Sequence, residues 1–477
     1  MIVKGIKRYS WILLVIMLAV FWKAPLHAEA ATTQVDNLVL MVNFSEDGDN
    51  TFSTNFNKYQ EMYTGTASAP KRSLEKYIST ISDEQVKVNN YFPQVVNGQF
   101  IPITITGTAQ QYPNASDGEL FVGAVINAVN QAGLSLPSKL DSRYNNGYID
   151  NLTIIVQVDK DKMTGAFGSR KADWGDSNTL LGGQWKVGAY NVLPTNMLGV
   201  GTLTDSGYSL ASHEFLHTLG APDLYRTSGE TGDPVGRWWD LMAGPNYTAS
   251  YPLTYTRKEL GWMSIGTLTE SGTYTLRPAE ESSGTRAYIL KTSRSDSEFF
   301  VVEYRQKPSP SEREDYDFYI PESGLIVYRV NNAVENHTNK AGDNYIYVFR
   351  KHTLDPAKAQ EEVMYATVGG QYRKALGSSD MDAPYTADTI FYSDGSNSGI
   401  VIDQVQPGAD GSISFHVEFP VLSADSYWQQ RGESITGLCS PAITGDAAGS
   451  CLYLAGIVEE QGWSLLKIYS SQAADGR

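Results

Sequence analysis

Cysteine and histidine are scarce in this chain of 477 residues, which has two cysteines and six histidines. Cys439 and Cys451 both lie near the C-terminus, where an oxidising compartment would let them close a small disulfide loop. Two free thiols are the alternative, and the sequence does not decide between them. Neither cysteine lies near His213 and His217, the one closely spaced pair of histidines.

Long apolar runs are missing after the N-terminal region, so we expect no membrane segment in the mature protein. The N-terminus itself has the parts of a secretory signal peptide. Residues 4–8 carry three basic side chains, residues 11–21 form an apolar core, and residues 28–30 offer a cleavage site. An uncleaved anchor is the alternative, but the apolar core is short for a bilayer span. We therefore assign residues 1–30 to a cleaved signal peptide and expect a secreted protein.

Basic side chains are outnumbered by acidic ones, with 37 Lys and Arg against 53 Asp and Glu and a formal net charge of −16. Cleavage of the signal peptide makes this charge more negative, because four of its five charged residues are basic. Nucleic acids and anionic membranes carry the same sign, so neither is expected as a partner. The surplus carboxylates leave ligands for calcium.

The chain is too long for one ordinary domain, and its hydrophobic content of 41% is typical of a globular protein. Residues 31–264 alternate strand and helix patterns, which predicts an α/β domain. Expected elements are strands over 35–44, 86–92 and 152–158 and helices over 73–81 and 117–132. Residues 159–201 lose periodicity, so we expect loops and short strands there, one of them an edge strand that pairs with an extended chain.

The remainder of the chain reads as β structure, so the fold class overall is α+β. Residues 265–420 predict an all-β, sandwich-type domain, because runs of strand length are separated by turn residues. Residues 421–477 form a short segment that would belong to a further β-module. The expected strands cover 273–277, 287–291, 298–305, 324–330, 345–349, 400–405 and 413–419.

The most informative run begins at residue 213 and reads His-Glu-Phe-Leu-His-Thr-Leu-Gly-Ala-Pro-Asp. Its two histidines, His213 and His217, are four residues apart and therefore lie on one face of a helix. Their ring nitrogens can reach one metal ion, with Glu214 beside it to act on a metal-bound water. Asp205 or Ser206 would cap the helix. A surface helix with two solvated histidines is the alternative.

A zinc hydrolase needs three protein ligands and one open position for water. Gly220 lets the chain leave the helix sharply, and Pro222 prevents helical continuation. Asp223, six residues after His217, can then swing back as the third ligand. The alternative is a turn residue that bonds its own backbone. Glu214 is expected to be the general base and not a ligand.

A methionine follows the proposed third ligand by about twenty residues, in the run Trp-Trp-Asp-Leu-Met-Ala-Gly over residues 238–244. A methionine in a tight turn beneath zinc-binding histidines is typical of metzincin peptidases. Without the preceding motif the same run would predict only a buried turn. Tyr247 lies just beyond and is a candidate to stabilise an oxyanion, with a packing tyrosine as the alternative.

At this point the chain resembles the secreted immune-inhibitor-A-like metallopeptidases, which are metzincin-like. The resemblance rests on residues 213–220, 222–225 and 239–242, and it extends to residues 259–262, 42–44, 147–152 and 299–305. It implies a bacterial, secreted zinc endopeptidase with calcium as a structural ion. On matching positions it places one catalytic zinc on His213, His217 and Asp223, and the general base at Glu214.

The chain departs from the family pattern in two places, and its candidate calcium-binding turns are a weaker feature. Long members carry a prosegment before the catalytic domain, whereas the first core strand here begins close to the signal-peptide junction. Leu216 stands where many relatives have glycine. Candidate calcium-binding turns cover residues 45–50 and 141–150, with solvated turns as the alternative, and Arg143 occupies a position where an EF-hand needs an oxygen ligand.

The sequence therefore predicts a zinc metalloendopeptidase that hydrolyses peptide bonds through a metal-activated water, with no covalent intermediate. Its partners would be protein or peptide substrates, and we expect a monomer. One alternative is a catalytically inactive relative that serves as a binding or adhesion protein. Another is a zinc amidase that acts on cell-wall peptides, because the zinc motif alone does not separate these substrates.

Overall fold

The computed structural model describes residues 32–47, 51–67, 71–114, 118–158, 165–167, 170–175, 179–198, 207–226, 234–236, 238–244, 249–312, 315–320, 323–340, 344–349 and 390–420, and the backbone of three strands between 435 and 470. Within these ranges, no helix combines the length and the apolar character that a bilayer crossing requires. The predicted signal peptide, Tyr247, both cysteines and the proposed cap at Asp205 or Ser206 lie outside the described residues.

The N-terminal unit is built on a sheet that is parallel except at one edge. Its strand order is β2-β1-β7-β10-β8, with β5 pairing the far end of β1. Only β8 runs antiparallel to its neighbour. The bounds are β1 (Thr33–Phe44), β2 (Val86–Tyr91), β5 (Ile103–Ile105), β7 (Asn151–Val156), β8 (Arg170–Asp173) and β10 (Ala189–Pro194).

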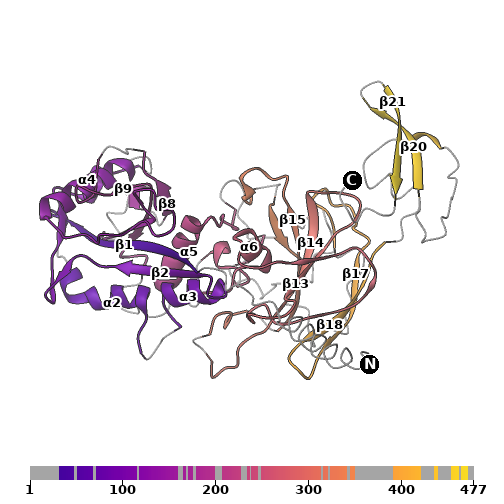
Figure 1. Ribbon diagram of the computed structural model, residues 1–477, viewed down its shortest axis with the longest axis horizontal. Helices are drawn as coiled ribbons and strands as arrows, with labels where there is room; N and C mark the ends of the chain where they lie inside the picture. Colours follow the sequence, from indigo (N-terminus) through magenta and orange to yellow (C-terminus); the bar gives the residue numbers. More distant parts are fainter. Residues whose placement is uncertain are drawn as a thin grey trace, which may run out of the picture.

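Helices cover both faces of this sheet, as Figure 1 shows. Successive residues of β1 point to opposite faces: Val39 and Met41 join the core that holds α2, α3 and α5, whereas Leu40 joins the core that holds α4. Both faces are thus buried, as is usual for parallel sheets. The bounds are α2 (Phe52–Thr64), α3 (Leu74–Ile81), α4 (Gly118–Ala132), α5 (Gly207–Leu219) and α6 (Thr254–Glu259).

Two further sheets follow and share one core, which gives the expected two-layer β arrangement. A five-stranded sheet has the order β11-β13-β14-β15-β16, and a three-stranded sheet has the order β12-β18-β17. Phe300 from the first sheet and Phe415 from the second lie in the same cluster of buried side chains. The bounds are β11 (Gly266–Leu268), β12 (Gly272–Leu276), β13 (Ala287–Leu290), β14 (Glu298–Arg305), β15 (Gly324–Asn331), β16 (Ile346–Val348), β17 (Val401–Pro407) and β18 (Ile413–Glu418).

The other face of the five-stranded sheet belongs to the core of the N-terminal unit. Val301 and Tyr328 lie in the same buried cluster as Leu241 and Tyr255. The change in sequence character near residue 264 therefore marks a change of secondary structure, while the hydrophobic core continues across it. Burial of this face is a large part of what joins the two units, since apolar area removed from water is the main favourable contribution to folding.

The expected strands and helices are found within a few residues of their predicted bounds, and the helices α2 and α6 were not expected. The region 159–201 was predicted as loops and short strands, yet it contains the six-residue buried strand β10. A last sheet pairs β19 (Ile435–Leu438), β20 (Tyr453–Glu460) and β21 (Trp463–Ser470). Shorter elements are β3 (Val95–Val96), β4 (Gln99–Phe100), β6 (Tyr148–Ile149), β9 (Lys186–Val187), η1 (Ala109–Gln111), η4 (Gly165–Phe167), η5 (Leu241–Ala243) and η6 (Glu335–His337).

Candidate metal centre

The two histidines of the motif lie on adjacent turns of α5, a helix that is buried along most of its length. The ring centroids of His213 and His217 are 4.9 Å apart, and the ring planes are nearly perpendicular at 88°. This is the outcome that their spacing of four residues predicts. Because α5 packs between the sheet and α3, the histidines sit on a helix that is fixed on several sides.

The helix ends immediately after the second histidine, and this ending brings in Asp223. Gly220 has φ 113°, a conformation that residues with a side chain rarely adopt, and the backbone N–H of Ala221 donates to the Leu216 carbonyl at 3.0 Å. The chain then turns back toward the helix. Asp223 Oδ1 lies 3.2 Å from Nε2 of His213 and 3.2 Å from Nε2 of His217.

Both imidazole rings are oriented by backbone carbonyls. Nδ1 of His213 donates to the Leu241 carbonyl at 3.0 Å, and Nδ1 of His217 donates to the Ala221 carbonyl at 2.8 Å. A carbonyl oxygen only accepts, so each Nδ1 carries a proton, and each ring turns its Nε2 toward Asp223. Such a contact on the far ring nitrogen is the usual support of a metal-binding histidine.

Two Nε2 atoms and one carboxylate oxygen therefore face one another, and a cation between them would accept a lone pair from each of the three. Asp223 Oδ1 is buried and receives no hydrogen bond of acceptable geometry, although both Nε2 atoms are close. The three possible metal-ligand atoms all lie within 4.8 Å of one another. Metal–ligand distances of about 2.0–2.1 Å in a tetrahedron place ligand atoms about 3.3 Å apart, close to the 3.2 Å between Asp223 Oδ1 and each Nε2. The residues present thus fit a zinc ion.

The electrostatics of the cluster also favour positive charge at its centre. Burial lowers the pKa of His213, but the close carboxylate of Asp223 and the charge of Glu214 outweigh it, so this pKa is raised. Burial raises the pKa of Asp223, but the two imidazoles outweigh it and hold this pKa below its usual range. A metal ion bound there would carry the positive charge in place of a proton.

Glu214 lies beside the cluster without belonging to it. Its side chain is 4% exposed, and its charge acts on His213 and on Tyr225. It is not one of the three residues whose donor atoms converge. Glu214 is therefore close to the three converging residues without adding a fourth ligand atom.

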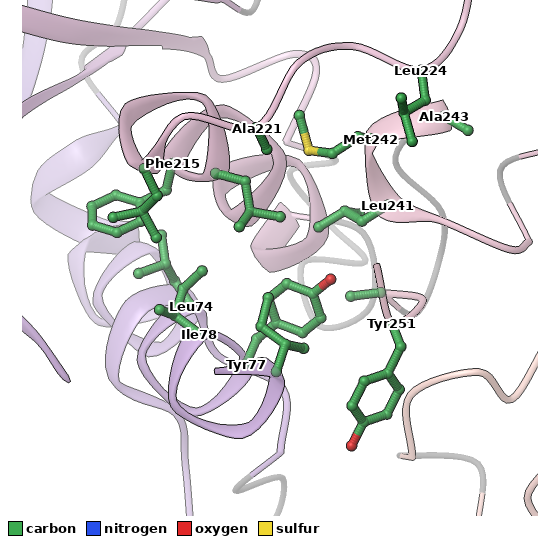
Figure 2. Close-up of a cluster of buried hydrophobic side chains, with 14 of the residues drawn as sticks. Leu74, Tyr77, Ile78, Phe215, Ala221, Leu224, Leu241, Met242, Ala243 and Tyr251 are labelled. Carbon is green, nitrogen blue, oxygen red and sulfur yellow. The ribbon is translucent and has the colours of Figure 1, made fainter. Parts of the chain in front are cut away.

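The predicted methionine turn supports the first histidine through its backbone. Asp240 caps the short helix η5 by accepting the Met242 N–H at 2.7 Å, and the next carbonyl, that of Leu241, is the one that holds His213. The Met242 carbonyl accepts the Leu224 N–H at 2.8 Å, next to the aspartate ligand candidate. The Met242 side chain lies in the core beside Ala221 (Figure 2).

Tyr225 is a site residue that the sequence reasoning did not single out. Its ring stacks on His213 with centroids 6.2 Å apart and an interplanar angle of 19°, and its hydroxyl lies near the Asp223 carboxylate. Burial and the charge of Asp223 raise its pKa, so the phenol keeps its proton. The available signal was its position two residues after Asp223, close in the chain to the proposed third ligand.

Polar side chains on three neighbouring strands form a hydrogen-bonded group, which we call the polar ladder, and this group contacts the side of α5 that faces the sheet. The Thr218 hydroxyl lies 2.9 Å from Asn151 Oδ1 and 3.2 Å from Asn191 Oδ1, on the neighbouring strands β7 and β10. Asn151 in turn donates to Asn37 of β1 at 2.8 Å. Arg143 donates to the Thr218 carbonyl at 3.0 Å. These contacts are buried or half-buried, so they fix the helix against the sheet one residue from His217.

The turns proposed for calcium use their carboxylates on backbone N–H groups in the described structure. Asp141 accepts from Gly147 at 3.0 Å, and Asp150 accepts from Arg143 at 2.9 Å. Asp47 accepts from Ala109 at 2.5 Å. Among the described residues, the cluster of His213, His217 and Asp223 is the group of histidines and acids with the spacing of a metal site. The calcium hypothesis therefore stays a prediction.

Comparison with protein-family models and with curated proteins finds no match for this chain. The candidate centre is therefore defined by the chain's own residues, and above all by the convergence of two imidazole nitrogens and one carboxylate oxygen at 3.2 Å.

Proposed function

We propose that this protein is a secreted, zinc-dependent endopeptidase with a metzincin-like catalytic domain. The observation that carries the proposal is the set of three donor atoms on His213, His217 and Asp223, which converge at ligand spacing. Each histidine is oriented by a carbonyl on its other nitrogen, so the arrangement does not depend on a flexible surface side chain. A helix with two solvated histidines has no need of these supports.

In this proposal His213, His217 and Asp223 hold the zinc ion. When bound, the ion supplies a Lewis acid that polarises a carbonyl group and lowers the pKa of a water molecule. Glu214 accepts a proton from that water and passes it to the nitrogen of the departing amine. Tyr225 keeps the Asp223 carboxylate in place and presents a protonated hydroxyl beside the centre. Its exposed fraction of 37% leaves it open to a bound substrate.

An extended polypeptide is the substrate that the sheet favours. The strand β8 (Arg170–Asp173) is the last in the sheet order, and within the described residues it pairs on one side only, with β10. It also lies next to α5, the helix that carries the histidines. An extended chain can add to such an edge through main-chain hydrogen bonds, which position a peptide bond without regard to sequence.

The test uses the full secreted chain, purified without added metal and analysed for bound zinc by mass spectrometry. We expect about one zinc per chain and chelator-sensitive cleavage of unfolded casein, with activity restored by added zinc. Cleavage of cell-wall peptides alone would replace the endopeptidase assignment with the amidase one. Stoichiometric zinc without hydrolysis of either substrate would favour a binding protein, and no zinc at all would refute the proposal.

A further inference from the structure

A single buried guanidinium joins the five-stranded sheet to the segment that supports the candidate metal centre. Arg305 is the last residue of β14 and is fully buried. We propose that Arg305 is a positioning residue for the metal centre, because it fixes both ends of the segment whose Leu241 carbonyl orients His213. This inference rests on the proposed function and adds that the β sheets are part of the centre's support.

The guanidinium contacts the supporting segment at two points. Nη1 of Arg305 donates to the Trp239 carbonyl at 2.9 Å, and Nη2 donates to the Tyr251 carbonyl at 3.0 Å. The turn that holds His213 lies between these two residues. Both carbonyls belong to residues that are almost fully buried, at 1% and 7% exposed, so each needs a donor from the protein.

The guanidinium is itself fixed by two carboxylates. Nε donates to Asp317 Oδ2 at 2.8 Å and Nη2 donates to Asp317 Oδ1 at 2.6 Å, while Nη1 donates to Glu303 Oε1 at 3.1 Å. These three hydrogen bonds, together with the two to backbone carbonyls, use all five N–H donors of the side chain. Because the guanidinium is planar and fully hydrogen-bonded, its orientation is fixed. The position of β14 therefore sets the positions of the Trp239 and Tyr251 carbonyls.

The path from Arg305 to the metal centre is short. Trp239 precedes Asp240, whose carboxylate accepts the Met242 N–H at 2.7 Å and the Leu253 N–H at 2.7 Å. These bonds lock the turn between the two points that the guanidinium holds. A shift of the Trp239 backbone therefore moves the Leu241 carbonyl two residues later, and with it the ring of His213.

The competing explanation is that Arg305 only stabilises the fold, and the chain offers a matched control for it. Arg329 lies in the neighbouring strand β15 and is equally buried. Its charge partner is Glu298 at 3.2 Å, and it donates to the Phe391 carbonyl at 3.2 Å. Neither partner belongs to the segment between residues 239 and 251. Loss of either arginine removes a buried charge with its partners, but among the contacts described above only those of Arg305 reach residues 239 and 251.

The experiment measures the zinc dissociation constant of the full chain by competition with a chromogenic chelator. Arg305→Lys keeps the charge, but lysine cannot reach both carbonyls and both carboxylates. We therefore expect zinc binding about tenfold weaker, as is typical when a residue that orients a metal ligand is lost. Arg329→Lys should bind zinc within about twofold of the wild type. If Arg305→Lys does not fold, Asp317→Asn keeps the guanidinium and loosens it, and we expect about threefold weaker binding.

The outcomes separate this inference from the proposed function. Unchanged zinc affinity in a folded Arg305→Lys protein, or in Asp317→Asn, would overturn the inference while the zinc site stands. Equal losses in the Arg305 and Arg329 variants would also overturn it, because both would then act through general stability. A wild-type protein that binds no zinc would refute the proposed function, and this inference with it.

Discussion

Thr218→Val tests whether the polar ladder on the sheet supports α5, the helix that carries the two proposed histidine ligands. Valine has nearly the shape of threonine but lacks the hydroxyl that lies 2.9 Å from Asn151 Oδ1 and 3.2 Å from Asn191 Oδ1. Asn151 is fully buried and Asn191 is 1% exposed, so water cannot take the place of the lost donor without a local opening. The substitution therefore leaves buried acceptors unsatisfied instead of removing one surface contact.

The cost of this change can be worked from the contacts. A buried acceptor left without its donor costs about 1–3 kcal/mol. The hydroxyl has one proton that its two acceptors share, so we take about 2 kcal/mol as the loss in the free energy of unfolding. In a cooperative unit of about 150–250 residues, each kcal/mol shifts the melting temperature by about 2–4 °C. For a unit of that size, the substitution would lower the melting temperature by about 4–8 °C.

Thermal unfolding monitored by calorimetry is the assay, with Thr218→Ser as the control that keeps the hydroxyl and loses only a methyl group. We expect the serine protein to lie closer to the wild type than the valine protein does. A valine protein as stable as the wild type would refute the reasoning. A serine protein destabilised as much as the valine one would show instead that packing of the methyl group matters.

Four further predictions concern the site and its surroundings. Glu214→Ala should keep its zinc, since the ligands remain, but lose about 10²–10⁴-fold in turnover, and near-normal turnover would remove its role as base. Asp223→Ala should lose zinc on dialysis; unchanged metal content would move the third ligand elsewhere. Tyr225→Phe should weaken zinc binding by about tenfold at most, measured by chelator competition. Burial and the charge of Asp317 raise the pKa of Glu280 to about 8, so the folded protein holds a proton there that the unfolded chain releases above its ordinary pKa of 4.5. Stability should therefore fall as pH rises from 4.5 to 8, and Glu280→Gln should reduce that fall in denaturant titrations.

The convergence of the three proposed ligands could be predicted from the sequence because it is local. His213, His217 and Asp223 lie within eleven residues, on one helix and its exit. Helical periodicity places the two rings together, and Gly220 followed by Pro222 predicts the reversal that brings in the aspartate. No long-range packing has to be known for these three side chains to converge. The strand β1 was predictable for the same reason, since its apolar run needs only its own residues.

The supports of the site could not be predicted, because they are made by groups that carry no sequence signal. A backbone carbonyl orients His213, and every residue has one, so the identity of Leu241 gives no clue. Thr218 meets Asn151 across 67 positions and Arg305 meets Trp239 across 66. Such contacts follow from the packing of whole elements. The helix α2 was missed for a local reason: its buried face is mostly aromatic, with Phe52, Tyr59 and Tyr63, in an otherwise polar run.

The boundary near residue 264 shows how composition and physical unity can differ. The sequence changes there from mixed helix and strand to strand alone, and composition alone would divide the chain at that point. Yet Val301 and Tyr328 complete the core that holds Leu241. The buried carbonyls of Trp239 and Tyr251 find their donor in Arg305, beyond the boundary. A chain cut at the boundary would expose that core and leave both carbonyls unsatisfied, at a cost of about 1–3 kcal/mol for each carbonyl. The N-terminal unit alone therefore contains every proposed ligand but lacks part of what holds the ligands in place.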